Sequence, residues 1–313
     1  MDGNSDAGGV LAAPRRGRIS PRVATTEERA ASKRLTVAVP VKGRLHESSL
    51  ILLDAAGFQL ETRDVRALSI RCRSAPIDVL LVRAADVPEY VQDGAVDCGI
   101  TGADLVGERD ADVVELLRLG FGSCTLEAAV LDDDPAQTLN DLHGRSVATV
   151  FPHLARTLLA ERGIDVELCQ VTGSVEIAPR LGLSDAIVDL VSSGSTLRTN
   201  GLRSLGALFE SEAVLIASAA SQERVNGLRA ALASVVQARN TRYLMFNAPR
   251  SAIPRIRDVL PTDGSPSVVP LLRSGAVAIH ALVPASSVWE LLPQLQALGA
   301  TSILLTSVEM LLA

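Results

Sequence analysis

Short apolar segments alternate with stretches of helical periodicity along the first part of the chain. Leu35–Pro40 is typical of a buried strand, and a helical stretch follows it through Leu53. Gly57 then stands at the C′ position, where glycine commonly ends a helix. Ile77–Val82 predicts a second buried strand and Val87–Gln92 a short helix. This order is typical of an α/β lobe.

The alternation continues in Val96–Leu105, which predicts a strand, a glycine-containing loop and the start of a helix. It restarts after Asp141 with a strand at Ser146–Val150, a helix at Leu154–Arg162 and a strand at Asp165–Val171. Because strands and helices alternate in both halves, we expect parallel sheets in two α/β lobes.

The pattern changes near the C-terminus. Val214–Ser218 predicts a strand that returns to the first lobe, and a long helix follows it. The remaining elements have the order β-α-β-β-α-β, which is the ferredoxin-like unit. They are predicted at Tyr243–Asn247, Ser251–Leu260, Val268–Leu271, Ala276–Val283, Val288–Leu298 and Thr301–Thr306.

These patterns predict four regions. We expect lobe I at 35–130 and 205–225, lobe II at 131–204, and a separate domain at 240–313. Residues 1–34 contain several arginines but no continuous apolar run, so they predict a disordered extension rather than a secretory signal.

Composition narrows the class of protein. Aromatic residues make up 3% of the chain, so Ala, Val, Leu and Ile must fill the core, which suits buried strands under helices. The net charge of −6 argues against a general nucleic-acid binder, because neutralising phosphates requires a basic face. No apolar run reaches the roughly 18 residues of a membrane span. We therefore expect a soluble cytoplasmic protein without a nucleic-acid or membrane partner.

The potential metal ligands are scattered. The 4 cysteines form no C-x-x-C pair, and the 4 histidines have no H-E-x-x-H spacing. Reduced, mostly buried thiols are therefore the better interpretation, and no zinc site is indicated.

One segment combines residues suited to a phosphorylated sugar. Asp185 and Asp189 stand on an apolar strand, and their carboxylates can accept hydrogen bonds from ribose hydroxyls. The strand runs into a loop in which Gly194 would let an anion approach the main chain. If Thr196 opens a helix, its terminal amides face the same anion. The loop consists of Ser192, Ser193, Gly194, Ser195 and Thr196. Taken alone, it could also be an ordinary strand-to-helix turn.

This segment resembles the phosphoribosyl pyrophosphate loop of ATP phosphoribosyltransferases. Four other segments resemble motifs of the same family, in the order expected of it, and the similarity covers 35–313. They are Val39–Leu45 (Val-Pro-Val-Lys-Gly-Arg-Leu), Gly99–Leu105, Leu119–Cys124 and Thr172–Arg180, which contains Gly-Ser-Val-Glu. Together the ordered motifs indicate the family, where any one of them would be a weak signal.

The resemblance implies a fold and an activity. Lobes of this family are similar to type II periplasmic-binding-protein lobes with a cleft between them. The family joins ATP to phosphoribosyl pyrophosphate with Mg²⁺, giving N1-(5-phosphoribosyl)-ATP and pyrophosphate, and so begins histidine synthesis. By the resemblance, the loop holds the 5-phosphate, and Asp185 and Asp189 lie at the ribose. It identifies no direct metal ligand.

The resemblance also implies roles outside the loop. Lys42 and Arg44 are candidates for binding pyrophosphate or the phosphates of ATP, although both could be solvated surface charges. Glu176 is expected near the sugar or its metal, unless it is structural. The residues expected near the adenine or ribose of the nucleotide are Asp104, Leu105 and Cys124.

The expected reaction needs no strong general base, because N1 of adenine already carries a lone pair at neutral pH. Catalysis should depend on positioning and on charge neutralisation at the leaving pyrophosphate. For this reason no histidine is a candidate catalytic base.

The C-terminal unit resembles the ACT-like regulatory domain of the family's long form, which binds histidine between subunits. The resemblance implies feedback inhibition by histidine, a homo-oligomer between dimer and hexamer that tightens on inhibition, and no separate regulatory subunit. Asn247 departs from the Asp of some relatives, and Val41 departs from the usual Asn of the first motif. The positions that match the histidine site are Asn247, Ser265, Ser267, Leu282 and Ser302.

Three other functions compete with this one. A solute-binding module shares the two-lobed fold, but the chain shows no secretory signal, and the phosphate loop favours an enzyme. A dinucleotide-dependent oxidoreductase would need a G-x-G-x-x-G after the first strand, which is missing. A catalytically inactive amino-acid sensor is disfavoured by Asp185, Asp189 and Gly194, which remain in place.

Overall fold

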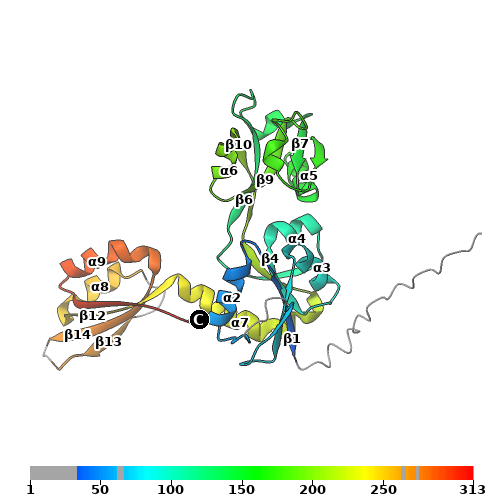
Figure 1. Cartoon of the computed structure of the whole chain (residues 1–313). Coiled ribbons are helices and arrows are strands. Elements are labelled where there is room, and N and C mark those ends of the chain that lie inside the picture. Colours follow the sequence, from blue (N-terminus) through cyan, green and yellow to red (C-terminus); the bar gives the residue numbers. More distant parts are fainter. Residues whose placement is uncertain (1–33, 62–66, 262–265, 273–274, 313) are drawn as a thin grey trace, which may run out of the picture. The chain divides into compact units, whose positions relative to one another are not determined.

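A computed structural model describes residues 34–61, 67–261, 266–272 and 275–312. The predicted extension at 1–34 therefore lies outside the described residues, except for Arg34, whose Nε donates a hydrogen bond to Asp78 Oδ2 at 2.9 Å. The described part of the chain contains three β-sheets (Figure 1). Its helices include none that is both long and apolar enough to cross a membrane.

Lobe I is built on a six-stranded mixed sheet. In β1, Val37 and Val39 pack in the core that includes α2 and α7 residues, whereas Ala38 packs on the other side with Val87 of α3. Helices therefore cover both faces of this sheet. The strand order is β2 (Ser69–Arg71), β3 (Ile77–Val82), β1 (Leu35–Pro40), β4 (Cys98–Gly102), β11 (Ala213–Ala217) and β5 (Val114–Arg118). The helices are α2 (His46–Ala55), α3 (Val87–Gln92), α4 (Ala103–Arg109) and α7 (Gln222–Arg239).

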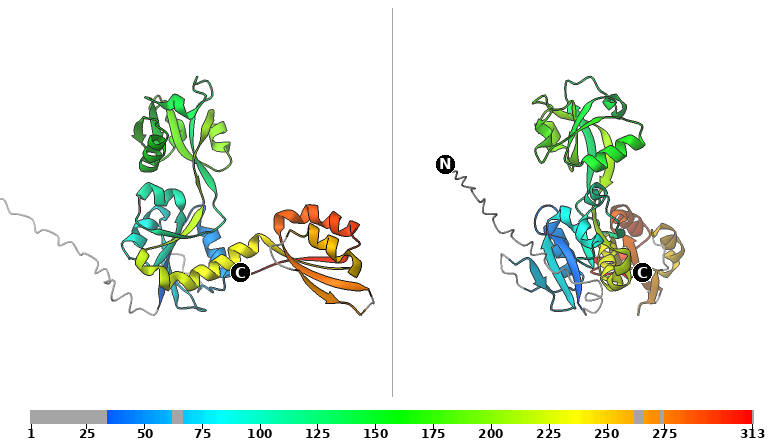
Figure 2. Two further views of the ribbon diagram at one scale, coloured as in Figure 1. Left: turned by 180° about the vertical axis from the view of Figure 1, so that it is seen from behind. Right: turned by 90° about the vertical axis from the view of Figure 1, so that its right-hand side faces the viewer.

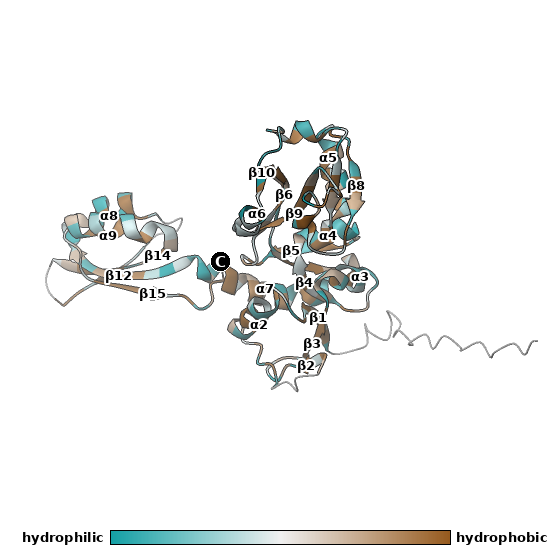
Figure 3. Ribbon diagram, turned by 45° about the horizontal axis from the view of Figure 1, so that its top comes forward, coloured by the Kyte–Doolittle hydropathy of each residue, from teal (hydrophilic) through white to brown (hydrophobic). Residues whose placement is uncertain are grey.

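Lobe II is built on a five-stranded sheet whose central strand is β9. This strand is parallel to β7 and antiparallel to β6. Its apolar residues make β9 largely brown in Figure 3. The strand order is β10 (Leu202–Ser211), β6 (Cys124–Leu131), β9 (Ala186–Val191), β7 (Ser146–Thr149) and β8 (Glu167–Gln170). The helices are α5 (Pro152–Glu161) and α6 (Ser195–Thr199).

Two expectations about the lobes need correction. The sheets are mixed rather than parallel: β6, which enters lobe II, runs antiparallel to β9 and to the returning β10, and β11 runs antiparallel to β4 and β5. The boundaries also differ from 130 and 205. Since β6 and β10 pair with each other along their length and β6 pairs with β9, both belong to lobe II, which begins after Ser123 and ends before Glu212.

The C-terminal domain confirms the predicted β-α-β-β-α-β order. Its sheet is antiparallel throughout, and α8 and α9 cover one face (Figure 2). Alternate residues of β12, such as Leu244 and Phe246, are buried under these helices. The strand order is β13 (Ser267–Pro270), β14 (Ala276–Pro284), β12 (Thr241–Pro249) and β15 (Thr301–Ser307), with α8 at Ile253–Val259 and α9 at Val288–Ala297.

A paired carboxylate stabilises lobe II. Asp134 accepts two hydrogen bonds from the guanidinium of Arg145, at 2.9 and 2.5 Å, and a third from Ala136 N at 2.9 Å. The Arg145 guanidinium, above all, lowers the pKa of Asp134 from 3.8 to about 2. Because the pKa is depressed in the folded state, the stabilisation is complete above the unfolded value and disappears as the pH falls toward 2.

We therefore expect Asp134→Asn to lower the free energy of unfolding by about 1–3 kcal/mol at pH 7. This difference should shrink as the pH falls from 3.8 toward 2, where the wild-type carboxylate becomes protonated. Urea unfolding of both proteins across this range measures it. Asp133→Asn, an exposed neighbour, is the matched control. A difference of the same size at pH 7 and pH 2 would contradict this role of the pair.

Candidate active site

The carboxyl end of β9 opens into the serine- and glycine-rich loop. Gly194 has a φ of +68°, a left-handed conformation that glycine adopts without strain. Helix α6 begins at Ser195, one residue before the predicted start at Thr196. The hydroxyl groups of Ser193 and Ser195 are hydrogen-bonded to each other at 2.9 Å. The loop is therefore a tight turn that exposes small polar groups.

A cavity of about 240 Å³ lies against this loop. It brings together Asp189, most of the loop that follows it, and Glu176 from a separate segment. Glu176 comes from a short 3-10 helix at Val175–Ile177. The lining residues are Glu176, Asp189, Leu190, Val191, Ser192, Ser193, Gly194, Thr196 and Leu197.

Asp189 is an ionisable group whose charge the folded state disfavours. Burial raises its pKa above the ordinary 3.8, and the negative charge of Glu176 raises it further. One opposing contribution comes from the Leu190 N–H, which donates a hydrogen bond to Asp189 Oδ1 at 2.8 Å. The charge of Asp189 therefore does not stabilise the folded state.

The structure does not bring Asp185 to the loop. This residue precedes β9 at its opposite end, about 13 Å of strand away from Asp189. Its carboxylate accepts hydrogen bonds from Ser146 Oγ at 2.6 Å and Ser146 N at 2.9 Å, and these bonds lower its pKa. Asp185 therefore links β7 to β9 and, contrary to the expectation that it lies at the ribose, does not line the cavity beside the loop.

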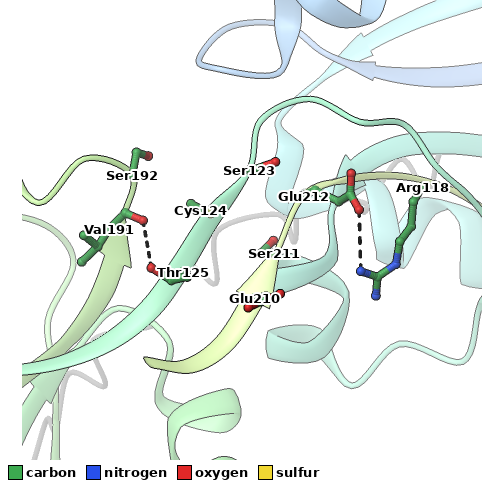
Figure 4. A pocket seen from close by; sticks show the side chains of 9 residues that line it. All are labelled: Arg118, Ser123, Cys124, Thr125, Val191, Ser192, Glu210, Ser211 and Glu212. Carbon is green, nitrogen blue, oxygen red and sulfur yellow. Dashed lines mark hydrogen bonds and ion pairs between the residues drawn. The ribbon is translucent and has the colours of Figure 1, made fainter. Parts of the chain in front are cut away.

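A second cavity, of about 280 Å³, lies where β6, β9 and β10 come together (Figure 4). It shares Val191 and Ser192 with the loop cavity, so the two adjoin. Cys124 is buried here, and that burial raises its pKa, so the thiol is a packing group rather than a nucleophile. The lining residues are Arg118, Ser123, Cys124, Thr125, Val191, Ser192, Glu210, Ser211 and Glu212.

The cationic candidates of the first motif lie after β1. Lys42 is exposed. Arg44 is partly exposed, and its Nη2 donates a hydrogen bond to Asp104 Oδ1 at 3.2 Å, while Nη1 donates to the carbonyl oxygen of Gly122. Asp104 is 1% exposed, so it lies under Arg44 rather than open to a nucleotide. Leu105, the next residue of α4, is half-buried.

Of the four described residues of the predicted histidine site, one lines a cavity. Asn247 lines a cavity of about 380 Å³ in the C-terminal domain, with Ala248, Pro249, Leu271, Gly275, Ala276, Gly299 and Thr301. Ser267, Leu282 and Ser302 lie on neighbouring strands, but they are not among these lining residues. Ser265 lies outside the described residues.

Several cavity residues carry no signal in the sequence. Thr125 and Ser211 stand on β6 and β10, which the hydrophobic pattern did not predict. The register of these two strands places Ser211 opposite Cys124. Only the pairing of strands distant in sequence could therefore have revealed Ser211 as a neighbour of the site.

The carboxylates fit a metal that arrives with a substrate. Among the described residues there is no group of three or more His, Cys, Asp or Glu that could hold an ion. Asp189 and Glu176 nevertheless line one cavity. Mg²⁺ is commonly bound by one or two carboxylates together with substrate phosphates, and this pair of oxygen donors matches that pattern.

Sequence comparison covers both the lobes and the C-terminal domain. A family model described as ATP phosphoribosyltransferase matches residues 83–238, and one described as "HisG, C-terminal domain" matches 238–310. The chain is 40% identical over 291 residues to the ATP phosphoribosyltransferase of Gemmatimonas aurantiaca, which covers 89% of this chain and 99% of that protein. It is 41% identical over 280 residues to the ATP phosphoribosyltransferase of Halobacterium salinarum, and this alignment covers 88% of this chain and 99% of the relative.

A solved structure agrees with these relatives. The chain resembles the ATP phosphoribosyl transferase (HisG:HisZ) complex from Thermotoga maritima with a TM-score of 0.56 and 26% identity, covering 65% of this chain and 98% of that chain. The expected fold class of two α/β lobes and a C-terminal ferredoxin-like domain is thereby confirmed. Together with the identity to relatives over almost their whole length, these matches show that the chain belongs to the ATP phosphoribosyltransferase family.

Proposed function

We propose that this chain transfers the 5-phosphoribosyl group of phosphoribosyl pyrophosphate to N1 of ATP and releases pyrophosphate. The observation that carries the proposal is the cavity at the carboxyl end of β9, where Asp189 and the loop around Gly194 lie together. Membership of the ATP phosphoribosyltransferase family supplies the reaction class and the nucleotide substrate.

The loop is proposed to bind the 5-phosphate. Ser192, Ser193 and Thr196 line the cavity with hydroxyl groups, and hydroxyls are good donors to phosphate oxygens. The left-handed Gly194 carries no side chain that would keep the anion from the backbone. Loop hydroxyls and backbone amides can therefore surround a terminal phosphate.

Asp189 is proposed to accept hydrogen bonds from the ribose hydroxyls. Burial has already removed much of the water around this carboxylate. A hydroxyl group that donates a hydrogen bond in place of that water therefore contributes favourably to the free energy of binding. Glu176 lines the same cavity and is proposed to contact the sugar or its metal. The two carboxylates are proposed to orient the ribose ring together.

Magnesium is proposed as the cofactor, held between these carboxylates and the phosphates of the substrate. When bound, Mg²⁺ neutralises charge on pyrophosphate. Lys42 and Arg44 are proposed to supply positive charge to the same phosphates or to those of ATP.

The nucleotide is proposed to occupy the adjoining cavity beside Cys124. Adenine N1 has a lone pair available at neutral pH, so the chain needs to orient the base rather than deprotonate it. Asp104 is proposed to act there through Arg44, because its own side chain is buried.

Histidine is proposed as a feedback inhibitor that binds the C-terminal domain of a homo-oligomer. The cytoplasm is proposed as the compartment in which the enzyme works. Asn247 supports the proposed histidine site, because it lines a cavity of about 380 Å³ in that domain. Its amide can accept a hydrogen bond from an imidazole or donate one to it, but it supplies no charge.

Two substitutions, one toward each end of β9, test the site. Asp189→Asn should lower kcat/KM about 10- to 100-fold, because a charged acceptor for the ribose is lost. It should leave stability at pH 7 unchanged or slightly higher. A carboxyl whose pKa is raised in the folded state costs stability once the pH exceeds that pKa, and Asn removes this cost.

Asp185→Asn is the matched control, and its effects should be reversed. Its carboxylate has a lowered pKa and so contributes stability above the ordinary value of 3.8. The variant should lose about 0.5–1 kcal/mol of unfolding free energy, a small value because Asp185 is exposed, while kcat/KM stays near that of the wild type. Near-normal activity of Asp189→Asn would remove the ribose-binding role.

Substitution of Asn247 tests the regulatory proposal. Asn247→Asp should lower the histidine concentration for half-inhibition roughly two- to fivefold, because a carboxylate can pair with imidazolium. The gain should be larger at pH 6 than at pH 8, since imidazole has a pKa of about 6.5. Asn240→Asp, outside the cavity, is the control. Inhibition curves of Asn247→Asp that coincide with those of the wild type at both pH values would contradict this role.

A further inference from the structure

We infer that Ser211 is a positioning residue for the transfer reaction, which holds Arg44 in place through Asp104. This inference rests on the proposed function, because it assumes that Arg44 acts on substrate phosphates. Ser211 is the last residue of β10, at the point where the chain leaves lobe II, and it is 4% exposed. Figure 4 shows it among the residues that line the cavity beside Cys124.

Ser211 and Asp104 form a reciprocal pair of hydrogen bonds. The Ser211 hydroxyl donates to Asp104 Oδ1 at 2.5 Å, and its oxygen accepts from Asp104 N at 3.0 Å. The second bond satisfies an N–H in the first turn of α4, which has no partner within the helix. The residue before that helix, Gly102, has no side chain with which to cap it. Ser211 supplies the missing cap from a strand distant in sequence.

Asp104 in turn holds Arg44. Its Oδ1 accepts both the Ser211 hydroxyl and Arg44 Nη2, the latter at 3.2 Å. Arg44 Nη1 donates to Gly122 O, which fixes the guanidinium at a second point. The carboxylate fits here because residue 102 is a glycine, since a Cβ at that position would clash with Asp104 Oδ1. The three side chains therefore form one chain of hydrogen bonds from β10 to the first motif.

This arrangement separates the cation that can reach a substrate from the groups that orient it. The side chain of Arg44 is 35% exposed, whereas the side chain of Asp104 is 2% exposed. Removing the Ser211 hydroxyl would leave a buried carboxylate oxygen without its shortest donor and a buried N–H without an acceptor. Asp104 would then be free to turn toward other donors, and Arg44 would lose the orientation that its carboxylate partner imposes.

A double-mutant cycle on the full-length enzyme tests the inference. Ser211→Ala should lower kcat/KM for phosphoribosyl-ATP formation about 10- to 100-fold, as expected for loss of a hydrogen bond to a charged group. In an Arg44→Gln background the same substitution should lower kcat/KM less than about threefold, because the residue through which Ser211 acts is already gone. A merely structural role would give the full loss in both backgrounds, and such additivity would overturn the inference.

A pair of isosteric variants keeps the test decisive if Ser211→Ala folds poorly. Ser211→Thr retains the hydroxyl and should keep most of the activity, whereas Ser211→Val has the same shape as the Thr variant without the hydroxyl and should lose it. Equal kinetics of these two variants would overturn the inference.

The control is Ser234→Ala, which removes an equally buried hydroxyl that bonds to Ala231 O in α7. It should leave the kinetics unchanged, and a loss equal to that of Ser211→Ala would contradict a specific role for Ser211. Absence of product from the wild-type chain would contradict the proposed function and overturn the inference with it. Additive effects in an active enzyme would overturn this inference alone.

Discussion

The position of β9 at the centre of the lobe II sheet is the constraint on which the candidate site depends. β9 pairs with β6 from Ala186 to Val191 and with β7 from Ala186 to Val188, so its first half is held on both sides and its carboxyl end by β6. Ala186, Ile187 and Val188 are fully buried and hold the strand by packing. The carboxyl end must then deliver Asp189 and the Gly194 loop to one place. A rigid strand that ends in a polar loop is a common way to place a binding site.

The two carboxylates associated with β9 show how a fold separates stability from function. Asp185 is satisfied by Ser146, and its depressed pKa means that the folded state favours its charge. Asp189 has a raised pKa, so the folded state holds its charge at a cost. In the proposed reaction, the hydroxyl groups of the bound ribose offset this cost by donating hydrogen bonds to the carboxylate. The hydrogen-bond chain from Ser211 to Arg44 extends this arrangement to lobe I, since it orients a cation from the last residue of the returning strand.

Much of the fold could be predicted from hydrophobic periodicity, because β1 and β3 are short, mostly apolar strands and α3 buries Val87 and Val91 at helical spacing. The loop around Gly194 was also visible, since a glycine among serines directly after an apolar strand is typical of a polar turn that can admit an anion. The pattern failed for β6 and β10, whose exposure alternates irregularly and whose pairing is antiparallel and long-range. Asp185 and Asp189 look alike in sequence, and only the direction of β9 distinguishes them. Ser211 could not be found at all, because its partner Asp104 is more than a hundred residues away along the chain.

The central claim is that the carboxyl end of β9 and the cavity beside it bind the two substrates of one transfer reaction. The most direct measurement mixes the purified full-length chain with ATP, phosphoribosyl pyrophosphate and Mg²⁺, and follows phosphoribosyl-ATP by its absorbance, with and without histidine. We expect product only when both substrates are present, and less product when histidine is added. A folded protein that binds both substrates and forms no phosphoribosyl-ATP would contradict the claim.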